Sequence, residues 1–262
     1  MSRDKRDKRV KQRGTKQKSA PTAAMLVIGN EILSGKIADQ NLVVLAEVLR
    51  KLGVKLERAL VIPDDLRQIA QAVRELAEHH TWVFTSGGVG PTHDDLTIAG
   101  VAKAFKKKVV DDAEMDALIR ATYGERLREG HLFMARVPSG ARLIRNEEVP
   151  WPAVLMRNVW VLPGVPEIFR MKMKLVEAEI APSAPLFSLS VLSTLDEGNL
   201  KPLLDRVVAD HPQVEVGSYP RWTDPHARTK LTFDGGDRAA CETARAAFVA
   251  SLPDGGFVSE DG

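Results

Sequence analysis

The chain has 262 residues, of which 44% are hydrophobic and 27% are charged, as in ordinary globular proteins. It contains no run of about 18 apolar residues, so a membrane-spanning helix is excluded and no membrane partner is expected. The single cysteine, Cys241, excludes an internal disulfide, and a cytoplasmic location is the expected one.

The formal net charge of +2 is unevenly distributed along the chain. Residues 1–20 carry nine Lys and Arg against two Asp, a net charge of +7, and the other 242 residues therefore carry −5. Because this segment has almost no large apolar side chains, it is predicted to be a disordered basic tail. Two interpretations of this tail are open. It could be an arm that binds nucleic acid or an acidic partner, or a solvated extension without a partner, and the second is favoured.

Strands and helices are predicted to alternate over the first part of the chain. Apolar residues at strand or helix spacing predict strands at 23–28, 54–62 and 82–85, and helices at 42–52, at 66–77 and from near Asp95. Gly53 stands where a helix C-cap belongs. Alternation of this kind implies a largely parallel sheet covered by helices, which is an α/β fold.

The second part of the chain is predicted to complete this domain and to add a smaller one. A helix is expected at 113–127, a hairpin over 153–156 and 159–162, and a helix at 167–180. Beyond a linker at 181–185, strands are expected at 187–193, 214–219 and 229–233, and helices at 199–209 and 238–252. The predicted domains are 21–182 and a small α+β domain at 183–262.

The segment Ser86–Thr97, SGGVGPTHDDLT, lies between a predicted strand and a predicted helix. Ligands of open α/β sheets bind at such carboxyl ends of strands. Gly87, Gly88 and Gly90 allow the backbone to approach a ligand closely, and the N-terminus of the following helix favours an anion. A phosphate or a diphosphate is therefore the expected ligand of this segment.

The acidic residues of the same segment point to a cation. Asp94 and Asp95 would repel a phosphate, whereas Mg²⁺ prefers one or two carboxylates together with phosphate oxygens. The simpler alternative is that one of these aspartates caps the helix. The segment is neither a Walker loop nor a dinucleotide fingerprint, because it contains no GKS or GKT and no GxGxxG. His93 is better explained as a solvent-facing loop residue than as a proton donor.

Three motifs together resemble the CinA-like proteins. They are GNEILSG at 29–35 with DQN at 39–41, SGGVGPTHDDLT at 86–97 and PGVPE at 163–167, in the order in which that family carries them. The family belongs to the MoaB/MogA molybdopterin-binding superfamily. The resemblance therefore implies a three-layer α/β sandwich with a mainly parallel sheet, followed by a small KH-like α+β domain, and it covers nearly everything after residue 22.

The resemblance also implies a function. It suggests a metal-dependent hydrolase of a nucleotide diphosphate such as ADP-ribose, or else a protein that binds molybdopterin or a nucleotide without turnover. The implied cofactor is a divalent metal such as Mg²⁺, with K⁺ as a second candidate cation and molybdopterin as an optional ligand. A nucleotide or pterin phosphate is the expected ligand, and self-association into a homo-oligomer is expected.

Positions that match the family's motifs give the expected site. Asp95 and Asp64 match acidic positions of molybdopterin-processing relatives and are the predicted catalytic residues, although Asp64 could instead cap a helix before Leu66. Asp94, Asp95 and Glu31 are the predicted metal ligands. The predicted ligand-binding residues are Gly29, Asn30, Glu31, Ser34, Asn41, Ser86, Gly87, Gly88, Gly90, Pro91, Thr92, Thr97, Pro163 and Gly164.

Three further observations concern the roles of Asn30, Asn41 and the small domain. Asn30 stands where many relatives carry Asp, which removes a charge that could bind metal. Asn41 either bonds a ligand or starts its helix. The small domain has no GxxG loop and the chain is only 5% aromatic, so nucleic-acid binding is not expected.

Overall fold

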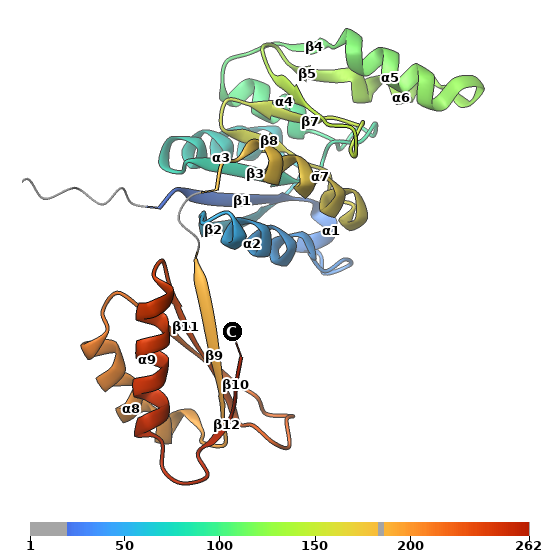
Figure 1. Ribbon diagram of the computed structural model, residues 1–262. Helices are drawn as coiled ribbons and strands as arrows, with labels where there is room; N and C mark the ends of the chain where they lie inside the picture. The colour runs from blue at the N-terminus through green and yellow to red at the C-terminus, as the bar shows by residue number, and fades with distance from the viewer. Residues whose placement is uncertain (1–19, 183–185, 262) are drawn as a thin grey trace, which may run out of the picture.

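The computed structural model of the protein describes residues 20–182 and 186–261 (Figure 1). The predicted basic tail, residues 1–20, lies outside the described residues except for its last residue, Ala20. In the two described ranges, none of the helices is both long and apolar enough to cross a membrane.

A six-stranded mixed sheet forms the centre of the first described range, with the strand order β2-β1-β3-β8-β7-β6. Neighbouring strands pair in parallel from β2 to β8, and the pairings of β8 with β7 and of β7 with β6 are antiparallel. The strands are β1 (Thr22–Ile28), β2 (Lys55–Ile62), β3 (Trp82–Ser86), β6 (Arg142–Ile144), β7 (Ala153–Met156) and β8 (Val159–Val161). The predicted, mainly parallel sheet is confirmed.

Helices cover both faces of this sheet. Met25 and Val27 of β1 pack into a core with α2 (Asn41–Lys51) and α7 (Pro166–Glu179). Leu26 and Ile28 point to the opposite face and pack with α3 (Leu66–His79) and α4 (Thr97–Ala104). Because β1 is buried on both faces, its sequence is a continuous apolar run rather than an alternating one. The predicted three-layer sandwich is confirmed.

A small subdomain extends the sandwich between α4 and β6. It contains β4 (Val109–Asp111), α5 (Ala113–Tyr123), η1 (Gly124–Arg126), α6 (Glu129–Leu132), η2 (Phe133–Ala135) and β5 (Arg136–Pro138). The predicted helix at 113–127 is too long, because Gly124 adopts a φ of 48° and ends α5. Only α5 was expected here. The short helix α1 (Asn30–Leu33), which follows β1, was also not predicted.

The predicted hairpin at 153–162 is confirmed. β7 and β8 pair in antiparallel register, and Arg157 in the connecting turn has a φ of 55°. A two-residue turn with a positive φ matches the right-handed twist of paired strands. This hairpin places the start of β7 next to the carboxyl end of β8.

The second described range forms a separate antiparallel sheet with the order β10-β11-β9-β12, and two helices pack on it (Figure 1). Its core includes Phe233, Phe248 and Cys241, so the cysteine is a packing residue. The elements are β9 (Phe187–Ser193), α8 (Glu197–Asp210), β10 (Glu215–Pro220), β11 (Thr229–Gly235), α9 (Arg238–Ser251) and β12 (Phe257–Asp261). The predicted small α+β fold is confirmed, with β12 as an additional strand.

Candidate functional site

A cleft of about 1270 Å³, here called the β3 cleft, lies at the carboxyl ends of β1 and β3. The chain places β2 on one side of β1 and β3 on the other, so the strand order reverses between β1 and β3. In open α/β sheets this switch point is where ligands bind, because the loops leaving the two strands diverge. Ile28 ends β1 and Ser86 ends β3, and both residues line the cleft.

Some of the predicted site residues line the cleft, and the others lie behind its wall. Those that line the cleft are Glu31, Ser86, Gly87, Gly88, Gly90, Pro91, Thr92, Asp95, Pro163 and Gly164. Those that do not line it are Gly29, Asn30, Ser34, Asn41, Asp64, Asp94 and Thr97. The hydrogen bonds of the second group hold the loops that carry the first.

The turn after β3 requires glycine. Gly87 has a φ of 102°, and a Cβ at this position would lie 2.2 Å from the carbonyl oxygen of Ile28. A positive φ is costly for residues with a Cβ, and here the added atom would also clash with backbone. The glycine therefore lets the loops after β1 and β3 approach each other at the switch point.

Backbone amides of this turn are available to an anion. The N–H of Gly87 donates to the carbonyl oxygen of Leu162 at 3.2 Å and is already used. In the described part of the chain, the N–H groups of Gly88, Val89 and Gly90 donate to no protein acceptor. Successive free N–H groups in a turn form a concave anion site. The three amides that follow Gly87 are thus available as hydrogen-bond donors to an anion.

Thr97 holds this turn in place from the buried side. It is the first residue of α4 and is completely buried. Its Oγ1 donates to the carbonyl oxygen of Gly87 at 2.8 Å, and its N–H donates to that of Gly88 at 2.9 Å. A Cβ on Gly88 would lie 2.5 Å from the Thr97 Oγ1. Thr97 therefore supports the turn rather than facing the cleft.

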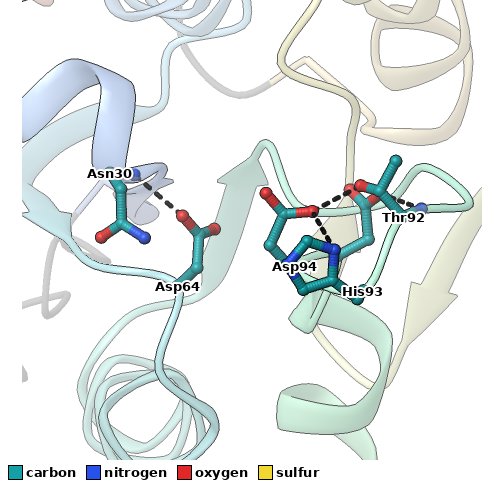
Figure 2. A network of polar contacts seen from close by, with 6 residues as sticks. Asn30, Asp64, Thr92, His93 and Asp94 are labelled. Carbon is teal, nitrogen blue, oxygen red and sulfur yellow. Dashed lines mark hydrogen bonds and ion pairs between the residues drawn. The ribbon is translucent and has the colours of Figure 1, made fainter.

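Asp94 and Asp95 both accept hydrogen bonds from Thr92 (Figure 2 shows the contact of Thr92 with Asp94). The Thr92 Oγ1 lies 2.5 Å from an oxygen of Asp94 and 2.6 Å from one of Asp95, and the Thr92 N–H donates to the same Asp95 oxygen at 2.7 Å. A hydroxyl has one proton, so it can donate to only one of the two carboxylates at a time. Two negative charges therefore converge on one small group.

Neither aspartate caps α4, so that alternative is wrong. The residue at the N-cap position is Leu96, and it makes no side-chain capping hydrogen bond. The Thr92 hydroxyl, together with a backbone hydrogen bond and the nearby His93, lowers the pKa of the exposed Asp94 carboxyl below its usual value. Asp94 therefore stays ionised at neutral pH. His93 itself is 98% exposed, as expected for a solvent-facing loop residue.

Asp64 secures the loop after β1. Its Oδ2 accepts a hydrogen bond from the N–H of Asn30 at 2.8 Å (Figure 2). The helix cap is the next residue, Asp65, whose Oδ1 accepts from the N–H groups of Arg67 at 3.0 Å and Gln68 at 2.8 Å. The capping alternative for Asp64 is therefore wrong. In the same loop, Ser34 Oγ donates to the carbonyl oxygen of Glu31 at 3.2 Å, a local contact that orders the turn.

The predicted acidic residues do not form a single group. Figure 2 draws a hydrogen bond between Asn30 and Asp64 and another between Thr92 and Asp94, and it draws none between the two pairs. Within residues 20–182 and 186–261, no three His, Cys, Asp or Glu side chains form a group that could hold a metal ion by themselves. Glu31 thus does not join the two aspartates of the β3 loop in such a group. The donor set fits a cation that takes most of its ligands from water and phosphate, as Mg²⁺ does.

Asn41 joins the end of β3 to the loop after β8. It starts α2, as one alternative proposed, and its side chain is buried. Its Nδ2 donates to the Oγ of Ser86 at 2.9 Å and to the carbonyl oxygen of Gly164 at 2.8 Å, while its buried Oδ1 has no partner in the described part of the chain. A Cβ on Gly164 would lie 3.2 Å from the Cα of Gly87. Asn41 therefore holds two glycine-containing loops in close contact.

Sequence analysis missed two features of the cleft. The first is an apolar wall that includes Tyr123, Phe133 and Trp151 from the subdomain and the loop before β7. The second is Lys172 of α7, a lining residue that is only 3% exposed. Lys172 follows Phe169 at an interval of three residues on the buried face of α7. A charged residue within the apolar stripe of a helix is a signal that the sequence itself contained.

The fold and the cleft together define a protein of the molybdopterin-binding class. A family profile described as a probable molybdopterin binding domain matches residues 24–182, and the chain belongs to this family. A second profile, described as the middle domain of FAD synthase, matches residues 185–261. The chain is thus a member of the group that contains CinA-like proteins and FAD synthase-like proteins, which confirms the resemblance read from the three motifs.

Individual relatives match over most of the chain. A protein of Archaeoglobus fulgidus is 33% identical over 239 residues, which cover 88% of this chain and 97% of that protein. A probable FAD synthase of Caenorhabditis briggsae is 30% identical over 86% of this chain, but the match covers only 48% of that protein. A crystal structure of a Thermoplasma acidophilum protein, described as CinA with unknown function, matches with a TM-score of 0.56 at 34% identity. It covers 62% of this chain and 98% of that chain.

Proposed function

We propose that the protein is a metal-dependent hydrolase that cleaves the diphosphate of a nucleotide such as ADP-ribose. The observation that carries this proposal is the turn after β3, where three free amides adjoin two converging carboxylates. The amides favour a phosphate, and the carboxylates favour a cation that neutralises it. Both groups lie at the switch point of the sheet, where ligands of this fold class bind.

Asp94 and Asp95 would hold the divalent cation together with phosphate oxygens and water. The metal, when bound, withdraws charge from the phosphoryl oxygens and assists an attacking water. Asp95 lines the cleft and is oriented by the N–H of Thr92, so it is the residue most directly placed to act on this chemistry. K⁺ stays a second candidate cation, and self-association stays a prediction from the superfamily.

Asp64 is proposed to act as a positioning residue. Its carboxylate does not line the cleft and is bound to the backbone of Asn30. It would therefore influence the reaction through the loop that carries Glu31, which does line the cleft. Replacing Asp64 should change ligand affinity more than it changes the chemical step.

The test is incubation of the purified protein with ADP-ribose and Mg²⁺, Mn²⁺ or Co²⁺, with release of AMP as the readout. Asp95→Asn is expected to lower kcat by at least about 100-fold, since a charge that acts on the reacting phosphate is removed. Asp116→Asn is the matched control, because Asp116 pairs with Arg120 on the surface of α5. Undetectable AMP release by the wild type would refute the hydrolase, and equal rates in wild type and Asp95→Asn would refute the proposed role of Asp95.

The second candidate is a protein that binds a molybdopterin or a nucleotide without turnover. The apolar wall formed by Tyr123, Phe133 and Trp151 favours this candidate as much as the first, because flat pterin or base rings bury well against aromatic side chains. Calorimetry with ADP-ribose and Mg²⁺ separates the two. Measurable binding without product would establish the binding protein.

A further inference from the structure

Lys172 is a buried cation in the wall of the β3 cleft. Its Nζ donates to the carbonyl oxygens of Trp151 and, at 2.8 Å, of Pro152 in the loop before β7. In the described part of the chain it forms no ion pair, so only neutral groups compensate its charge. An ammonium group has three N–H donors, and these two carbonyls use two of them.

Burying this charge is unfavourable. Removing an ammonium from water is costly, and two neutral acceptors recover only part of that cost. Desolvation by this burial lowers the pKa of Lys172 to about 8. A negative oxygen at the third N–H would stabilise the charged form, and the cleft is the side from which such an oxygen can arrive.

Lys172 lies at the same edge of the sheet as the glycine turn. Phe84, Trp160 and Leu155 form one row across β3, β8 and β7. The cleft lies three residues beyond this row. Counting forward along β3 from Phe84 gives Gly87, and counting backward along the antiparallel β7 from Leu155 gives Pro152. Two strand spacings separate them, a distance of about 10 Å. One extended ligand can therefore contact the turn and the ammonium group together.

We propose that Lys172 contacts an anionic oxygen of the ligand at the β7 side of the cleft, as the counterpart of the glycine turn at the β3 side. This inference rests on the proposed function in that it assumes a nucleotide diphosphate as ligand. In addition, it makes Lys172 a residue that determines specificity. The site would select ligands that have one negative oxygen at the glycine turn and another that reaches Lys172 of α7.

The inference predicts a pH dependence of binding. The other charged groups on this side of α7 and in the lining of the cleft do not contribute to the pKa shift of Lys172, whose cause is desolvation. They are Arg170 and Lys174 of α7, Glu148 before β7, and the lining residues Glu31, Asp39, His93, Asp95 and Arg136. Anion binding requires the protonated amine. Affinity should therefore fall roughly tenfold between pH 7 and pH 9, as the free lysine loses its proton.

A purely structural role for Lys172 would be to tie α7 to the loop before β7. Lys174 provides the matched control, because it also joins α7 to that loop, through an exposed ion pair with Glu148 at 2.7 Å. Lys172→Met removes the buried donor and keeps a flexible side chain of similar length. Lys174→Met removes the second tie and leaves the cleft unchanged.

The experiment is calorimetric binding of ADP-ribose with Mg²⁺, and separately of inorganic diphosphate with Mg²⁺, at pH 7, 8 and 9. Lys172→Met is expected to bind ADP-ribose about 10- to 100-fold more weakly at pH 7 and to lose the pH dependence. Lys174→Met should match the wild type within about twofold. Urea unfolding of each variant confirms that it is folded.

The outcomes separate this inference from the proposed function. If wild type and Lys172→Met bind ADP-ribose equally at pH 7 with the same pH profile, the role of Lys172 is refuted while the proposed function stands. If Lys174→Met weakens binding as much as Lys172→Met does, Lys172 acts through the loop and the inference also fails. If the wild type binds neither probe, the proposed function fails, and the inference fails with it.

Discussion

The two domains differ in whether their buried polar side chains have hydrogen-bond partners. In the small domain, Ser193 Oγ donates to the carbonyl oxygen of Gly256 at 2.6 Å, and Thr229 Oγ1 donates to that of Leu195 at 2.8 Å. Both hydroxyls are buried and paired, as buried polar groups in stable cores normally are. Among the described residues of this core, no buried side-chain nitrogen or oxygen lacks a hydrogen-bond partner.

The sandwich domain contains the buried polar atoms that lack partners. Among the described residues, the buried side-chain atoms without a hydrogen-bond partner are Asn41 Oδ1, His80 Nδ1 and Trp160 Nε1, of which His80 Nδ1 lies 3.7 Å from the Glu57 carboxylate. Asn41 holds the loops of the β3 cleft, and Lys172 adds a buried charge at the cleft wall. Such burial is unfavourable for stability, and here one case, Lys172, lines the cleft while the other, Asn41, supports its loops. The comparison favours the sandwich, rather than the small domain, as the location of the proposed binding site.

The largest expected effect comes from breaking the turn after β3. Gly87→Ala should lower the free energy of unfolding by roughly 2–4 kcal/mol and abolish ADP-ribose binding, because its Cβ would clash with the backbone of Ile28. Gly140→Ala is the control: Gly140 has a φ of 83° but open space around it, so only about 1 kcal/mol is expected. Urea unfolding and calorimetry measure both. Equal losses for the two variants would show that the turn is not specially constrained.

A smaller effect is expected from separating the loops that Asn41 joins. Asn41→Ala should destabilise the fold by about 2 kcal/mol, since the carbonyl oxygen of Gly164 loses its donor, and should weaken ADP-ribose binding about tenfold. Asn158 is the matched control, because its Nδ2 donates to the carbonyl oxygens of Ala77 and His80, each at 3.0 Å, away from the cleft. Asn158→Ala should destabilise similarly and bind normally. Weaker binding by Asn158→Ala would mean that binding follows general stability.

The smallest effect is expected in the small domain. Trp222 is 94% exposed, and Trp222→Ala should change the free energy of unfolding by less than about 0.5 kcal/mol. Binding of ADP-ribose should be unchanged, as measured by the same calorimetry. A clear loss of affinity would contradict the division of roles between the two domains.

The sequence predicted the parts of the fold that depend on local patterns. The long helices and the buried strands were found because their apolar periodicity extends over many residues. The hairpin of β7 and β8 was found because two apolar runs flank a polar pair, Arg157 and Asn158. The strands β4, β5 and β6 were missed because three residues are too few to show a period. β12 was missed because its pairing with β9 is long-range and its residues are mostly polar.

The site was predictable only in outline. The glycine turn and the two adjacent aspartates were found because their composition is unusual in itself. The partners of Asp64 and Asn41 were not found, since the hydrogen bonds to Asn30, Ser86 and Gly164 join positions 34 to 123 residues apart. Spacing along the chain carries no information about such contacts.

A crystal structure of the protein with a non-hydrolysable ADP-ribose analogue and Mg²⁺ tests the central claim most directly. The account predicts phosphate oxygens within hydrogen-bond distance of the N–H groups of Gly88, Val89 and Gly90, with the cation next to Asp94 and Asp95. A diphosphate bound elsewhere, or a turn whose amides contact no ligand while the analogue occupies another surface, would contradict it.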